Sequence, residues 1–201
     1  YSMSPSWGDV DNDGWPELAV GTWSLGGRPN EQSLFLFKNT VGDLSLTEFR
    51  SEGEYLDQDV FIPRFADINN DGFQDMLVVA DLNQSQVYLN RGNGVFDRIT
   101  DNSGAATDEN GMGSAIGDYD NDGDLDWFVS SIYHDSDNFG VMWGRTGNRM
   151  YRNDGTGHFE DVTTLAGVRD GSWGWAALFE DLDLDGDLDL YHVNGWSNAD
   201  F

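Results

Sequence analysis

Hydrophobic and polar residues alternate in short runs along the whole chain, and this pattern predicts β-strands. The runs ELAVGTW, SLFLFKN, DMLVVA and SQVYLN show it most clearly, and turns rich in Gly, Asn and Asp separate them. No segment carries a convincing helical period. The chain is therefore expected to be all-β.

The strand pattern recurs four times along the chain. The segments WGDVDNDGWPELAVG, FADINNDGFQDMLVV, IGDYDNDGDLDWFVS and FEDLDLDGDLDLYHV align without a gap, and their first aspartates lie 58, 51 and 63 residues apart. Each unit contains four short strands, with the exception of the last. The repeat units run roughly over residues 1–58, 59–109, 110–171 and 172–201, of which the last is incomplete.

Repeats of this length with four strands each predict the antiparallel blades of a β-propeller. A sandwich or barrel has no reason to repeat its sequence at this period, and a calcium-binding β-helix would repeat about every nine residues. The chain is a single propeller segment, 1–201, with about three and a half blades, whereas propellers close with about four to eight. We expect it to be part of a seven-bladed propeller that missing segments or other chains complete.

An acidic loop of nine residues recurs in every repeat. Position six is always glycine, and oxygen-bearing side chains stand at positions one, three, five and nine. Alternating oxygen ligands that bend around a point suit a hard cation with about six to eight ligands. With a backbone carbonyl at position seven, the predicted ligand residues are Asp9, Asp11, Asp13, Trp15 and Glu17 (loop one), Asp67, Asn69, Asp71, Phe73 and Asp75 (loop two), Asp118, Asp120, Asp122, Asp124 and Asp126 (loop three), and Asp181, Asp183, Asp185, Asp187 and Asp189 (loop four).

Calcium is the expected cation, with about four ions per chain, one in each loop. Magnesium demands a tighter octahedral geometry, and zinc or copper favours His or Cys, which none of the loops contains. Loop two has one carboxylate fewer because Asn69 stands at position three, so its site is predicted to be the weakest. Metal binding is expected to order each loop and to stabilise the fold.

Two alternatives compete with a propeller calcium loop. An EF-hand begins in the same way, but it needs a bidentate glutamate at position twelve and a helix after the loop. Position twelve is Val20, Val78, Val129 or His192, and the flank is strand-like. A solvated acidic turn is the other alternative, and four copies with the same glycine and the same downstream acid argue against it.

The residues just before each loop follow the period of a strand. Trp7, Phe65, Ile116 and Phe179 stand two residues before position one, and smaller residues stand four before it. This pattern predicts that the large side chains pack in the core rather than contact a ligand.

Composition narrows the possible partners. The chain has 37 acidic and 10 basic residues, and its formal charge of -27 opposes binding to nucleic acids and to anionic membrane surfaces. It contains no cysteine, which excludes disulfides and thiol nucleophiles. No apolar run is long enough to cross a membrane, so membrane insertion is not expected.

These residues resemble the FG-GAP/VCBS repeats of integrin-α-like β-propellers, whose D-x-D-x-D-G-x-x-D loops bind calcium between the first two strands of a blade. The stretches YRNDGTGHFEDVTTLAGV and GWAALFEDLDLDGDLDLYHVNG are similar to the cartilage acidic protein and ASPIC/UnbV group. The chain departs from the family pattern at Asn69 in position three and Glu17 in position nine. The Phe-Gly and Gly-Ala-Pro sequence that gives the FG-GAP repeat its name is also poorly conserved in this chain. The resemblance implies a secreted or cell-surface module for recognition, adhesion or scaffolding, and related propellers include lectins and a few sugar-modifying enzymes.

The resemblance also implies that loops joining strands two and three lie on the face opposite the acidic loops. A protein or glycan ligand is expected there, on a surface formed by Trp23, Arg28, Trp143, Arg145 and Trp196. The alternative is that these aromatic residues only cap the ends of blades.

An enzyme is the competing class. His134, His158 and His192 are the only histidines, and none has a recognisable nucleophile partner. No catalytic residue is therefore predicted, and a sugar-active enzyme remains the less favoured alternative.

Overall fold

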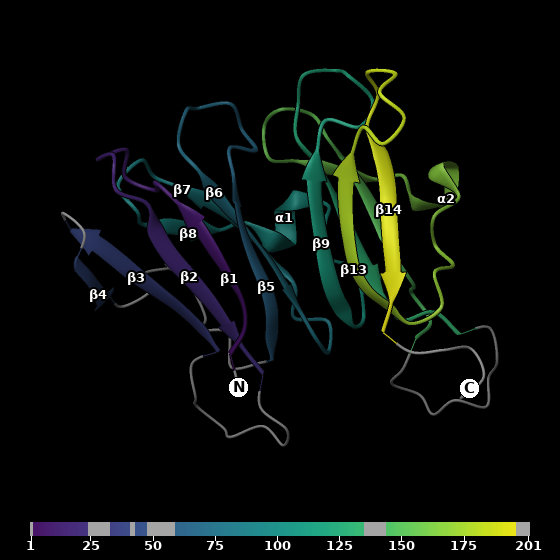
Figure 1. Ribbon diagram of the computed structural model, residues 1–201, viewed down its shortest axis with the longest axis horizontal. Coiled ribbons are helices and arrows are strands. Elements are labelled where there is room, and N and C mark those ends of the chain that lie inside the picture. The colour runs from purple at the N-terminus through teal and green to yellow at the C-terminus, as the bar shows by residue number, and fades with distance from the viewer. Residues whose placement is uncertain (1, 24–32, 41–42, 48–58, 135–143, 196–201) are drawn as a thin grey trace.

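The computed structural model describes residues 2–23, 33–40, 43–47, 59–134 and 144–195, and within them the chain forms four antiparallel β-sheets (Figure 1). In every sheet the strands follow one another in chain order. Sheet one contains β1 (Ser2–Gly8), β2 (Glu17–Thr22), β3 (Leu34–Thr40) and β4 (Asp43–Thr47); sheet two contains β5 (Val60–Ala66), β6 (Asp75–Ala80), β7 (Gln86–Asn90) and β8 (Phe96–Arg98); sheet three contains β9 (Gly111–Gly117), β10 (Asp126–Ser131), β11 (Arg149–Asn153) and β12 (Phe159–Asp161); sheet four contains β13 (Gly174–Glu180) and β14 (Asp189–Asn194).

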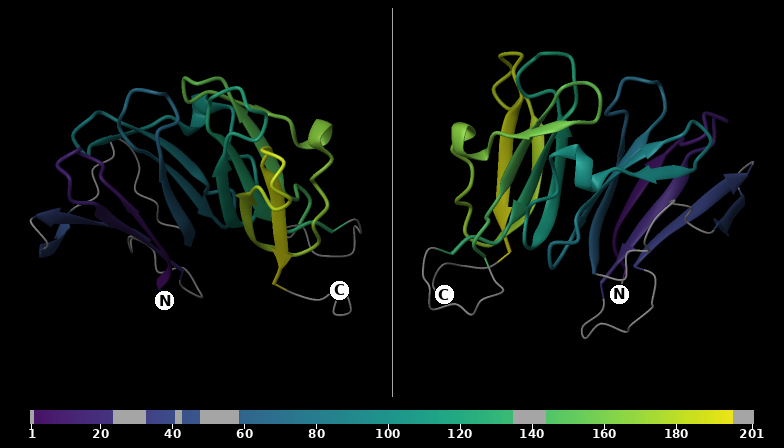
Figure 2. Two further views of the ribbon diagram at one scale, coloured as in Figure 1. Left: turned by 45° about the horizontal axis from the view of Figure 1, so that its top comes forward. Right: turned by 180° about the vertical axis from the view of Figure 1, so that it is seen from behind.

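The sheets stand side by side in an arc, as Figure 2 shows from two further directions. The first strands of neighbouring sheets, β1, β5, β9 and β13, contact one another in that order. Each sheet is therefore a propeller blade whose first strand lies on the inner side of the arc. The predicted all-β propeller architecture, with three four-stranded blades and two strands of a fourth, is confirmed.

Strand β6 shows why the apolar runs after the acidic loops are continuous. All six of its residues are buried, because the blade packs on a neighbour at both faces. Met76 and Val78 belong to the core between sheets one and two, whereas Leu77 and Val79 belong to the core between sheets two and three. Alternate side chains of a strand point to opposite faces, so a blade between two others needs apolar residues at every position.

The predicted packing of the residues before each loop holds in three of the four repeats. Phe65, Ile116 and Phe179 each pack against the core that their blade shares with the preceding blade. Trp7 is 53% exposed, because no described sheet precedes sheet one. The prediction of a core role is therefore wrong for Trp7 within this chain.

The fourth strand of the second and third blades is only three residues long. After β8 and β12 the chain turns into the single-turn helices α1 (Thr100–Ser103) and α2 (Thr163–Ala166). The Thr100 hydroxyl accepts a hydrogen bond from Val87 N at 3.0 Å, and the Thr163 hydroxyl accepts one from Met150 N at 2.9 Å. The threonine side chain thus replaces the next backbone partner of the ladder, and the chain leaves the sheet.

Among the residues that the structure describes, no helix has the length and apolar character needed to cross a membrane.

Candidate metal centre in the acidic loops

The four acidic loops connect the first two strands of each blade. Because consecutive connections of a meander alternate between the two ends of a sheet, all four loops lie at the same edge of the blades (top of Figure 1). The connection between β6 and β7 lies at the opposite edge.

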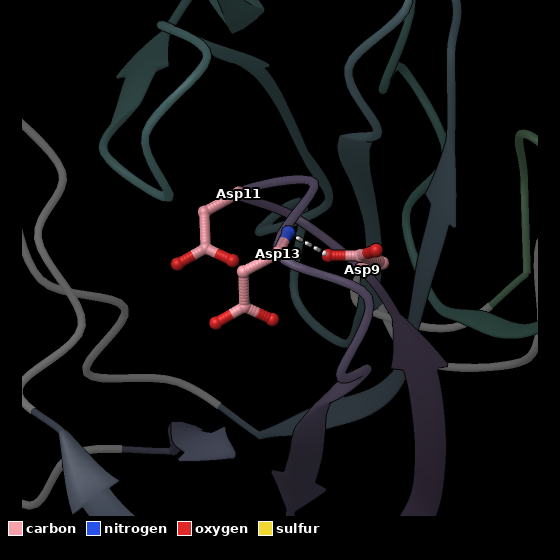
Figure 3. A group of neighbouring side chains, drawn as sticks. All are labelled: Asp9, Asp11 and Asp13. Atoms are coloured by element: carbon pink, nitrogen blue, oxygen red, sulfur yellow. Dashed lines mark hydrogen bonds between the residues drawn. The ribbon is translucent and has the colours of Figure 1, made fainter. Parts of the chain in front are cut away.

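The aspartate at position one organises the turn by accepting two backbone hydrogen bonds. In loop one, Asp13 N donates to Asp9 Oδ1 at 3.0 Å (Figure 3), and Gly14 N donates to Asp9 Oδ2 at 2.9 Å. The same two bonds form in loops two, three and four at 2.8 to 3.2 Å. The four sequences therefore fold into one local structure.

Two residues of each loop adopt a positive φ. Position six has φ between 88° and 101°, which a glycine adopts without strain, and a Cβ atom there would meet nothing within 4 Å. Backbone conformation, and not lack of space, thus requires this glycine. Position four has φ between 55° and 63° and is an asparagine in three loops, which suits the tolerance of asparagine for the left-handed region.

In each of three loops, three carboxylate groups have oxygens that lie within 4.8 Å of one another. Positions one, three and five converge in loops one and three, whereas positions one, three and nine converge in loop four. In loop two the Asn69 amide nitrogen donates to Asp71 Oδ2 at 3.0 Å. The carboxylate clusters could hold a metal ion, and Figure 3 shows the carboxyl groups of Asp11 and Asp13 turned to the same side of loop one.

The residues present fit a hard divalent cation. Their side-chain donor atoms at positions one, three, five and nine are oxygens, apart from the amide nitrogen of Asn69. In loop one, Asp11 Oδ1 is buried and has no hydrogen-bond partner. A buried carboxylate oxygen without a partner is unfavourable, and a bound cation would satisfy it.

The acid at position nine lies deeper than the other predicted ligands in the three complete blades. Glu17, Asp75 and Asp126 are at most 1% exposed. Each accepts the backbone N–H of position two with one oxygen and the backbone N–H of a third-strand asparagine with the other, at 2.7 to 3.3 Å. The position-nine side chain therefore joins the loop to the third strand of its own blade.

Burial also changes the acidity of these groups. Loss of solvent raises the pKa of Asp75 to about 7 and that of Asp126 to about 6, although the backbone N–H groups oppose this shift. The pKa of Glu17 is raised for the same reason. Nearby loop aspartates raise all three pKa values further, and a divalent cation would reverse that part of the effect by favouring the ionised form.

The third-strand asparagines were not predicted as site residues. The amide of Asn90 donates to the carbonyls of Gln74 in its own loop and of Val10 in the preceding blade, and that of Asn153 donates to Leu125 and Ile68 in the same manner. Asn90 and Asn153 thus each connect two neighbouring blades at the edge that carries the loops, whereas the amide of Asn39 donates to Pro16 of its own loop. The sequence held a signal for them, because SLFLFKN, QVYLN and RMYRN all end in asparagine.

Neighbouring loops also contact each other directly. The position-four amides of Asn70 and Asn121 donate to the position-seven carboxylates Asp124 and Asp187 of the next loop, at 2.7 and 2.8 Å. Asn12 donates to the Gly72 carbonyl at 3.1 Å. Position-seven side chains thus serve contacts between loops in two cases, and the proposed ligation through their backbone carbonyls stays a prediction.

The structure describes only part of the predicted ligand surface. Trp23 donates from Nε1 to Asp81 Oδ2 at 3.1 Å, and its ring lies 6.1 Å from that of Phe61. Arg145 is exposed, and its backbone N–H donates to Glu109 Oε2 at 2.7 Å. Arg28, Trp143 and Trp196 lie outside the described residues.

Comparisons with known proteins agree with the repeat analysis. The model of the FG-GAP-like repeat matches residues 9–78, 67–129 and 135–192, which together make up well over half of the chain. No match was found among curated proteins. A solved structure of an Agrocybe aegerita lectin, described as specifically recognising non-reducing terminal N-acetylglucosamine, is 14% identical with a TM-score of 0.48, and the match covers 95% of this chain and 43% of the lectin. This chain therefore spans less than half the length of that lectin. With three matched repeats, the chain belongs to the FG-GAP-like repeat family.

Proposed function

We propose that this chain is a calcium-stabilised β-propeller module of a secreted or cell-surface protein, which serves in recognition, adhesion or scaffolding. One observation carries the proposal: three loops share the same backbone geometry, and within each of them three carboxylate groups have oxygens less than 4.8 Å apart. Carboxylates gathered so closely repel one another in the absence of a cation. Calcium supplies the compensating charge and accepts the number of oxygens that such a loop offers.

The chain's own residues give the ion its effect on stability. Positions one, three, five and nine would hold it, and position one already fixes the turn through two backbone N–H groups. Position nine anchors the loop to the third strand, and the position-four amides join one loop to the next. Ordering one loop therefore supports its own blade and the neighbouring one.

Calcium titration with thermal melting and counting of bound ions tests this function. We expect about four ions per chain at saturation, and we expect removal by EDTA to lower Tm by at least about 5 °C. Magnesium at the same concentration is the control and should restore only part of Tm, because it binds such flexible oxygen sites less well. An unchanged Tm in EDTA together with fewer than two bound ions would contradict a calcium role.

We further propose that the protein or glycan ligand binds at the blade edge opposite the acidic loops. Trp23 and Trp175 both lie next to Phe61 there, with ring centroids 6.1 Å from it, and Trp175 is 44% exposed. The exposed Trp175 ring offers a stacking surface that suits a sugar as well as a protein side chain, and Asp81 holds the Nε1–H of the half-buried Trp23 nearby.

A glycan array and a pull-down from extracellular fluid distinguish these ligands, with Trp175→Ala as the variant and the exposed Leu165→Ala as its control. Loss of binding in Trp175→Ala alone supports this surface. Equal binding by both variants and the wild type places the ligand elsewhere.

A further inference from the structure

Lys38 on β3 places its ammonium group in loop one. Its Nζ contacts Asp11 Oδ2 and lies 3.6 Å from Asp13 Oδ2 and 3.7 Å from Glu17 Oε1. These three carboxylates stand at positions three, five and nine, which are the positions predicted to ligate the metal. A side chain of the protein thus carries a positive charge among the predicted ligands.

The other complete blades lack this arrangement. Lys38 precedes the third-strand asparagine of its blade, where Leu89 and Arg152 stand in the next two blades. Leucine carries no charge, and Arg152 pairs instead with Glu160 across the sheet at 2.6 Å. Arg91, Arg98 and Arg149 of those blades pair with Asp97, Asp101 and Asp161, none of which belongs to an acidic loop. The charge of Arg152 opposes the rise in the pKa of Asp120 in loop three, but the ion pair of Arg152 is with Glu160. Loop one is therefore distinguished by an ammonium group that lies directly among its carboxylates.

We propose that Lys38 is an internal counter-cation of loop one, which competes with calcium and makes this loop the last to fill. The proposal rests on the calcium function proposed above. An ammonium group and a divalent ion that share carboxylates repel each other, so calcium must displace the lysine before it can use Asp11. The Lys38 side chain is 35% exposed, and its flexible stem gives the ammonium a path to solvent.

The competition by Lys38 changes the expected order of calcium affinity among the four loops. Carboxylate count alone makes loop two the weakest, because Asn69 replaces an acid. Lys38 offsets one of the four negative charges of loop one and must also give up its ion pairs when calcium enters. Loop one therefore combines the reduced charge of loop two with a competing cation, and its calcium affinity falls below that of loop two.

Loop one also carries its own optical reporter. Trp15 stands at position seven, where the other loops have Phe73, Asp124 and Asp187, and its side chain is 43% exposed. Terbium substitutes for calcium in oxygen sites and emits when a nearby indole transfers energy to it. The part of the terbium emission that Trp15→Phe removes therefore reports loop one, since phenylalanine keeps the backbone carbonyl.

The test compares calcium competition against terbium in the wild type, Lys38→Leu and Lys38→Gln, with bound ions counted in parallel. We expect both substitutions to lower the calcium concentration that half-fills loop one by about tenfold, because one competing charge is removed. Arg98→Leu is the matched control: it removes the same charge from an ion pair with Asp101, outside the loops, and should leave loop one unchanged.

The possible outcomes separate this inference from the calcium function. If calcium fills the loops but half-filling of loop one is the same in the wild type and both Lys38 variants, the competition by Lys38 is wrong and the calcium function stands. If no loop of any variant binds calcium or terbium, the calcium function is wrong as well. The glutamine variant keeps a long polar side chain on β3, so a folding defect of Lys38→Leu does not prevent the measurement.

Discussion

Loops three and four have almost the same sequence, DYDNDGDLD and DLDLDGDLD, yet their position-nine acids lie in different environments. Their position-one hydrogen bonds agree closely, at 3.0 to 3.1 Å. Asp126 is fully buried and accepts two backbone N–H groups, whereas Asp189 is exposed and, among the described residues, accepts only the backbone N–H of Leu182. The hydrogen bonds of position one therefore form from the loop sequence alone, whereas the burial and full bonding of position nine depend on the rest of the blade.

The difference arises from the third strand. In sheet three, β11 brings Asn153 to the loop, where its backbone N–H completes the bonding of Asp126 and its amide reaches the preceding blade. In sheet four, the described residues form two strands only. A complete blade thus turns an acidic hairpin into a site anchored in the core.

The largest expected effect comes from removing that third-strand anchor. Asn153→Ala deletes the amide that donates to the buried carbonyl of Ile68 and the partly buried carbonyl of Leu125, and it leaves both without this partner. We expect the free energy of unfolding to fall by about 3 kcal/mol, measured by urea denaturation in EDTA. The exposed Asn102→Ala on α1 is the control and should change it by less than about 0.5 kcal/mol. Equal effects of the two substitutions would show that the anchor does not matter.

A direct comparison of the two acids should give the next largest effect. An asparagine at position nine has one accepting oxygen, so Asp126→Asn leaves either Tyr119 N or Asn153 N without an acceptor. Asp189→Asn can still accept from Leu182 N. We expect a loss of about 1–2 kcal/mol for the first and less than about 0.5 kcal/mol for the second in EDTA at pH 7. Similar losses would mean that the third strand adds nothing to the site.

An effect of similar size concerns pH dependence in the complete blades. Burial raises the pKa of Asp108 to about 6, against the hydrogen bond from Ser85 and the attraction of Arg149. Its pKa in the unfolded chain is about 3.9, so the folded state binds more protons between about pH 4 and 6. This carboxyl group therefore lowers stability as pH rises through that window, and its effect is constant above it.

Asp108→Asn removes this titration. We expect the fall in unfolding free energy from pH 4 to pH 7 to be smaller than in the wild type by about 2 kcal/mol, as measured by urea denaturation at both pH values. Asp101→Asn, on the exposed face of α1, provides the control. The same fall in the wild type and Asp108→Asn would show that burial does not raise the pKa of Asp108.

Much of the fold follows from local sequence. The apolar run DMLVVA predicts a strand, and its burial at both faces agrees with the propeller expected from the repeat. The threonines that end β8 and β12 could not be recognised in the same way. Thr100 and Thr163 complete a ladder formed with residues 13 positions earlier, and a hydroxyl that replaces a backbone group leaves no hydrophobic pattern.

The sequence by itself determined the acidic turns, because position one, the left-handed positions and the glycine all act within nine residues. It could not assign Lys38 to loop one, since the lysine lies 27 residues beyond Asp11 and meets it only through the pairing of β2 with β3. Nor could it show that Asn153 reaches Ile68, which lies 85 residues away in the preceding blade. Local hydrogen bonds are encoded by spacing along the chain, whereas the cation in loop one and the anchors between blades exist only because the sheets pack side by side.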